Sequence, residues 1–180
     1  GVARHVRELA NALESSATAA VMLLEPQPGD LLKLSWVNPV SNFSVTLSAT
    51  TCEGLLERLE AFEFDLIHYH HLMGFPAWIL TLPEALEVPY WFTVHDFMSV
   101  CPQLHFLTAA GSYCGQPDID ECRRCVAERP DPWGLGIDQW RERFAGWLGR
   151  AKRVIAPTAG VAASVERYFP ELDIAVLGHF

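Results

Sequence analysis

Four of the five cysteines in this chain lie within one short segment, and their spacing suits metal binding. They are Cys101, Cys114, Cys122 and Cys125, and the last two form a C-x-x-C pair. A tight turn with this spacing points two thiolates toward one cation, and four thiolates are a common ligand set for structural zinc. The segment therefore predicts a zinc site with a structural role.

A histidine and an aspartate lie just upstream of the cysteines, at a position where ligands often bind. His95 and Asp96 follow the apolar residues 88–94, which are typical of a buried strand. Both side chains are therefore expected at the carboxyl end of that strand. In an open parallel sheet, this is the edge at which ligands bind.

The composition limits the classes of protein to consider. The chain has 180 residues, of which 50% are hydrophobic, so one substantial core and a single domain over residues 1–180 are expected. Its 13 basic and 22 acidic residues give a formal charge of -9. This charge repels phosphate backbones, so no nucleic-acid partner is expected. No apolar run reaches the roughly 18 residues that cross a bilayer.

Helical and strand-like patterns alternate along the chain and position these chemical groups. Such alternation with short connections predicts an α/β fold with a doubly wound, Rossmann-like parallel sheet. Residues 25–42, rich in Pro and Gly, are expected to form a loop, and residues 97–130 a Cys-rich insert. The strands are expected at residues 19–24, 44–49, 64–69, 88–94, 152–156 and 174–177.

Five stretches follow one another along the chain, and they are GVARHVRELANAL, FDLIHYHHL, TVHDFMSVCP with the cysteines after it, AKRVIAPTAGV and IAVLGHF. In this order they resemble glycosyltransferases of the GT-B fold, particularly family 4. The resemblance implies the amino-terminal, acceptor-side domain of a retaining glycosyltransferase. Such an enzyme would transfer a sugar from a nucleotide-sugar, with no catalytic metal, to a glycan or lipid-linked acceptor.

The chain also departs from the family pattern at both ends. The family's first strand and the start of its Gly-rich loop are missing before Gly1, and the chain ends at residues 178–180, where family members enter the carboxyl-terminal, donor-binding domain. The chain by itself is therefore expected to be inactive. The resemblance places the complete enzyme in the cytoplasm, at the inner face of the membrane if it makes peripheral membrane contact.

The resemblance assigns roles to particular residues. His95 resembles the family's cleft histidine and is the expected catalytic residue, although a hydrogen-bonded structural histidine is the alternative. Alternation along a strand separates His71 from His68 and His70, which disfavours a three-histidine metal site. Thr158 would either contact a ligand or cap a helix. The expected substrate-binding residues are Gly1, His70, His71, Asp96 and Thr158.

Two questions stay open at the level of sequence. The cysteines could bind zinc, form disulfides or a Cys122–Cys125 redox pair, or stay reduced. Zinc is favoured because a reducing compartment disfavours disulfides, and because a polar insert with few core residues needs a cross-link. The alternative to an enzyme is a zinc-stapled module that binds a carbohydrate or a protein without catalysing a reaction.

Overall fold

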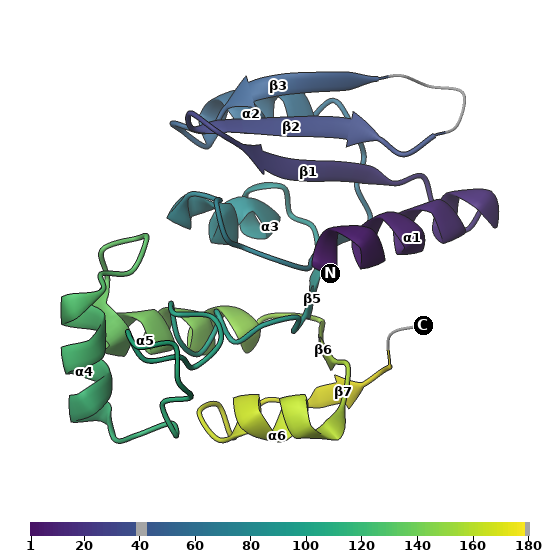
Figure 1. Ribbon diagram of the computed structural model, residues 1–180. Coiled ribbons are helices and arrows are strands. Elements are labelled where there is room, and N and C mark those ends of the chain that lie inside the picture. Colours follow the sequence, from purple (N-terminus) through teal and green to yellow (C-terminus); the bar gives the residue numbers. More distant parts are fainter. Residues whose placement is uncertain (39–42, 179–180) are drawn as a thin grey trace. The chain divides into compact units, whose positions relative to one another are not determined.

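A computed structural model describes residues 1–38 and 43–178 of the protein. The chain groups into two compact units, shown in Figure 1. The first unit consists of Gly1–Asp65 and Gly74–Val88, and the second of Leu66–Met73 and Pro89–Phe180. Each unit has its own sheet, so we describe them separately.

The first unit is built on a three-stranded antiparallel sheet in the order β1-β2-β3. Leu32 and Leu34 of β2 and Leu55 and Leu59 of α2 are buried and form much of its core. Its elements are α1 (Val2–Ser15), β1 (Met22–Gln27), β2 (Leu31–Trp36), β3 (Ser44–Ser48), α2 (Glu53–Leu59), the 3-10 helix η1 (Ala77–Thr81) and α3 (Leu82–Ala85).

The prediction of a loop over residues 25–42 is wrong for much of that segment, because β1 and β2 form a hairpin there. Gln27 pairs with Leu31, and the turn between them has positive φ at Gly29 (78°) and Asp30 (52°). Gly and Asp adopt this conformation more readily than most residues, and such turns match the twist of a hairpin. Pro26 is tolerated because β1 is an edge strand. Residues 39–42 of the predicted loop lie outside the described residues.

The second unit contains a four-stranded parallel sheet in the order β4-β5-β6-β7. This confirms the predicted α/β class, whereas the strands predicted at 19–24 and 44–49 belong to the antiparallel sheet of the first unit. The elements are β4 (Ile67–Tyr69), β5 (Tyr90–Thr93), α4 (Ile119–Glu128), α5 (Gly136–Leu148), β6 (Arg153–Ala156), α6 (Ala159–Glu166) and β7 (Ile174–Val176).

An aromatic cluster holds α5 against the parallel sheet. Trp147 of α5 stacks on Tyr90 with ring centroids 5.0 Å apart, and the Tyr90 hydroxyl donates a hydrogen bond to the Trp147 carbonyl. Trp147 also contacts Tyr69 and Phe92 edge-on. The helical stripe of aromatic residues on α5 is therefore core, and it supports the β4 and β5 strands from which the candidate site begins.

Candidate active site

Two histidines meet where β4 and β5 end. Tyr69 of β4 pairs with Phe92 of β5 in parallel register, so both strands deliver the residues that follow them to the same edge of the sheet. There, Nδ1 of His70 lies 3.0 Å from Nε2 of His95, at hydrogen-bond distance. Since one ring nitrogen of the pair must donate and the other accept, this contact couples the tautomers of the two imidazoles.

A second pair forms from the residues that directly follow the two histidines in the chain. Nδ1 of His71 lies 2.6 Å from Oδ2 of Asp96, an ion pair whenever the imidazole is protonated. The other carboxylate oxygen of Asp96 accepts a hydrogen bond of 2.8 Å from the Met98 backbone N–H. The Asp96 side chain is only 9% exposed and is shielded from solvent, whereas the His71 side chain is 28% exposed. Asp96 thereby fixes both the His71 ring and the turn that leads into the Cys-rich segment.

His68 stays within the strand and has a structural contact. Its Nε2 lies 2.8 Å from the hydroxyl of Thr93 on β5, and its ring lies 4.0 Å from that of His70. The predicted alternation therefore holds, because His68 and His70 share one face and His71 pairs elsewhere.

The other two predicted site residues begin helices. Thr158 follows β6, is exposed, and accepts a 3.2 Å hydrogen bond from the Val161 N–H at the start of α6. It is the N-cap of α6, and its own hydroxyl proton can still be donated to another group. Gly1 is the N-cap of α1 in the first unit, and an added Cβ there would meet no atom within 4 Å.

Comparison with known families decides what kind of protein carries this site. The family model described as Glycosyltransferase Family 4 matches residues 1–179. The chain belongs to this family. A search of the curated proteins finds no match.

Membership of Glycosyltransferase Family 4 confirms the family predicted from the order of the sequence motifs. The second unit has the fold expected of it, a parallel sheet flanked by helices in the Rossmann-like manner. Among the described residues, no helix is both long and apolar enough to cross a membrane. The domain is thus of the glycosyltransferase type.

In this glycosyltransferase domain, the four predicted metal ligands lie around one cavity in the second unit. The cavity has a volume of about 410 Å³, and Cys101, Cys114, Cys122 and Cys125 all line it. None of them forms a disulfide. Burial raises the pKa of the Cys101 thiol to about 11, while a backbone hydrogen bond from Gln103 acts in the opposite direction. Cys52 belongs to the first unit, where it is the N-cap of α2.

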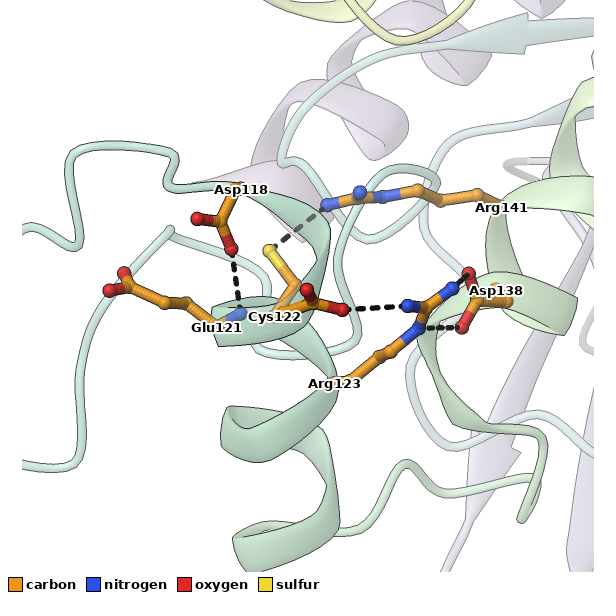
Figure 2. Close-up of polar contacts among 7 residues, drawn as sticks. Asp118, Glu121, Cys122, Arg123, Asp138 and Arg141 are labelled. Atoms are coloured by element: carbon orange, nitrogen blue, oxygen red, sulfur yellow. Dashed lines mark hydrogen bonds and ion pairs between the residues drawn. The ribbon is translucent and has the colours of Figure 1, made fainter.

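The expected tight turn at the C-x-x-C pair is wrong, because Cys122 and Cys125 lie within helix α4. Asp118 caps this helix by accepting a 2.9 Å hydrogen bond from the Glu121 N–H, visible in Figure 2. Residues three apart on a helix face the same way, so α4 still presents both thiols on one side. The N-cap aspartate, rather than the cysteine spacing, decides the local conformation.

One buried carboxylate, that of Asp131, was not among the residues predicted from the sequence. Asp131, 7% exposed, precedes α5 and accepts hydrogen bonds of 2.9 to 3.0 Å from the backbone N–H groups of Trp133, Leu135 and Gly136. The pKa of Asp131 lies below its ordinary value. Burial alone would raise it, but the backbone hydrogen bonds outweigh burial. The D-P-W-G turn sequence is the feature that could have indicated it.

Proposed function

We propose that the chain is the acceptor-side half of a retaining glycosyltransferase that uses a nucleotide-sugar as donor, with His95 at the reaction centre. The supporting observation is the paired arrangement of His70 with His95 and His71 with Asp96 at one sheet edge. Family membership supports the class of reaction. Four polar side chains held in pairs at a ligand-binding edge favour a reacting site over ordinary surface.

The chemistry of the transfer determines what His95 would contribute. The sugar gains positive charge as its bond to the diphosphate breaks, while negative charge builds on the leaving phosphate. An imidazole at the sugar can donate or accept a hydrogen bond as this charge develops. We assign His95 this contact, and His70 the task of fixing the His95 ring through the 3.0 Å contact.

The remaining predicted residues would bind substrate. His71, oriented by Asp96, offers a polar group for acceptor hydroxyls. Thr158 has a hydroxyl proton to donate beyond the sheet edge. Gly1 and the amino end of α1 offer backbone N–H groups for donor phosphates, where no side chain would obstruct a close approach. No catalytic metal is needed for these contacts.

The acceptor we propose is a glycan or a lipid-linked sugar, and the compartment is the cytoplasm. A lipid-linked acceptor would bring the enzyme to the inner face of the membrane through peripheral contact.

Sugar transfer assays test this function directly. An enzyme that carries this chain is incubated with uridine, guanosine or adenosine diphosphate sugars and a panel of glycan and lipid-linked acceptors. We expect release of nucleoside diphosphate to depend on both donor and acceptor. NMR of the product should show the donor's anomeric configuration retained.

Two outcomes would contradict the proposal. An inverted product would exclude the retaining mechanism. Tight glycan binding without turnover of any donor would favour the zinc-stapled binding module instead.

A further inference from the structure

The Cys-rich segment has little hydrophobic core of its own. From Gln103 to Arg129, all of which the structure describes, only Phe106 and Val126 are buried. Helix α4 has one buried residue, and its ion pair to α5, between Arg123 and Asp138 in Figure 2, is exposed. Exposed ion pairs stabilise a fold only weakly, because water screens them. Some other interaction is needed to hold this segment in one conformation.

One of the cysteines, Cys114, has a backbone amide directed at its sulfur atom. The Gln116 N–H donates to Sγ of Cys114 over 3.4 Å. At Cys114 the geometry depends on positive φ at Gly115 (73°) and Gln116 (53°), a conformation that costs energy for a residue other than glycine. Amides placed in this way stabilise a thiolate more than a neutral thiol.

Cys122 and Cys125 face arginines. Nη2 of Arg129 lies 2.8 Å from Sγ of Cys125, and Nη2 of Arg141 lies 3.5 Å from Sγ of Cys122. Figure 2 shows Arg141 reaching from α5 toward Cys122 on α4. Further contacts hold both guanidinium groups in place. Arg129 also donates a hydrogen bond to the Leu107 carbonyl. Arg141 donates to the Val100 carbonyl, and its guanidinium lies 4.4 Å from the centre of the Tyr168 ring.

The two arginines could offset the charge of a zinc ion bound by four thiolates. A zinc ion with four thiolates carries a net charge of about −2, which is costly in a partly buried site unless cations lie nearby. Arg129 and Arg141 supply two positive charges at two of the sulfurs. Three of the four sulfurs, those of Cys114, Cys122 and Cys125, thus have a donor suited to a thiolate, from an amide or a guanidinium.

We infer that Cys101, Cys114, Cys122 and Cys125 bind one zinc ion as thiolates, and that this ion holds the Cys-rich segment of the second unit in one conformation. This site is separate from the His70–His95 pair and does not depend on the proposed sugar transfer. The zinc has a structural role, because four protein ligands leave no position for substrate.

Zinc binding must draw the thiols together. No three of the four sulfur atoms lie within 4.8 Å of one another, whereas the edges of a ZnS4 tetrahedron are about 3.8 Å. Closure of the cavity around the metal should therefore accompany binding. Backbone amides between Cys101 and Arg129 should exchange with solvent more slowly with zinc than without it.

Metal analysis of the chain, purified under reducing conditions, is the decisive experiment. We expect about one zinc per chain. The fine structure of its X-ray absorption spectrum should fit four sulfur ligands at about 2.3 Å. The variant Cys125→Ser should lose the tetrathiolate shell, whereas Cys52→Ser, in the other unit, should retain it. Arg129→Ala keeps all four ligands and should weaken zinc binding by about 10- to 100-fold.

Other results would overturn the inference. One such result is a folded wild-type chain that contains no zinc and has five reactive thiols. The other is a peptide containing Cys122 and Cys125 whose mass is lower by two hydrogens, which would show a disulfide between them. If Cys125→Ser fails to fold, cobalt added to the metal-stripped wild-type chain decides the matter. Spectral bands of a tetrahedral tetrathiolate complex support the site, and their absence argues against it.

Discussion

His70 and His95 are 25 positions apart in the chain, yet their ring nitrogens Nδ1 and Nε2 lie 3.0 Å apart. The parallel pairing of β4 with β5 produces this contact, because each histidine lies just beyond the end of its strand. Neither ring can change tautomer without affecting the other. Substituting a histidine of this pair should therefore show whether its role is catalytic or structural.

The substitution His95→Ala should lower turnover by roughly two to four orders of magnitude in an enzyme that carries this chain. The reason is the loss of one hydrogen-bonding or proton-transfer group at the reacting sugar. Single-turnover rates and melting temperatures measured on the same preparations check this. His105→Ala, at an exposed position of the same unit, is the matched control. A large fall in melting temperature with the rate preserved would make His95 a structural residue.

Asp96→Asn should release His71 while largely keeping the turn. The amide oxygen of Asn can still accept from the Met98 N–H, but the charge opposite His71 is gone. We expect the free energy of unfolding to fall by about 1 to 3 kcal/mol and acceptor KM to rise. Urea unfolding and acceptor titration measure the two effects. If KM does not change, His71 does not bind the acceptor.

Asp131→Asn should destabilise the fold at neutral pH and matter less in acid. The folded-state pKa of Asp131 lies below its ordinary value, so the carboxylate stabilises the fold above the unfolded pKa of about 3.9. That contribution is lost as the pH falls through the folded pKa. Unfolding free energies from pH 7 to pH 3 should therefore converge for wild type and variant. Asp173→Asn, at an exposed position, should show no such convergence.

Tyr90→Phe should make the fold less sensitive to alkali. Burial raises the pKa of Tyr90 to about 12, so the neutral phenol stabilises the fold fully below its unfolded pKa of about 10. This contribution is lost as the pH rises from about 10 toward 12. Near pH 8 the variant should be less stable by about 1 kcal/mol, for the lost bond to the Trp147 carbonyl.

Above pH 10, wild type should lose stability faster than Tyr90→Phe. Tyr113→Phe, at a residue that is 62% exposed, should follow the wild-type profile. Parallel profiles for wild type and Tyr90→Phe would show that Tyr90 does not control alkaline unfolding.

Local patterns in the sequence were enough to predict the parallel-sheet unit and the family. Short apolar runs mark β5 and β6, and the helical stripe with Trp140, Phe144 and Trp147 marks α5 as core. These elements depend on periodic burial, which can be read from a few neighbouring residues. The same reasoning placed His70 and His95 at strand ends, because parallel strands share a carboxyl edge.

Which side chains contact one another could be learned only from the tertiary structure. The contact of His70 with His95 depends on the register of β4 against β5, and Asp131 depends on three amides that curl around its carboxylate. The β1–β2 hairpin was missed because Pro26 and Gly29 indicate a loop unless the neighbouring strand is known. Likewise, Arg129 and Arg141 became relevant to the cysteines only when α4 and α5 brought them together. Pairing and register are set by contacts between distant residues, which a local pattern does not contain.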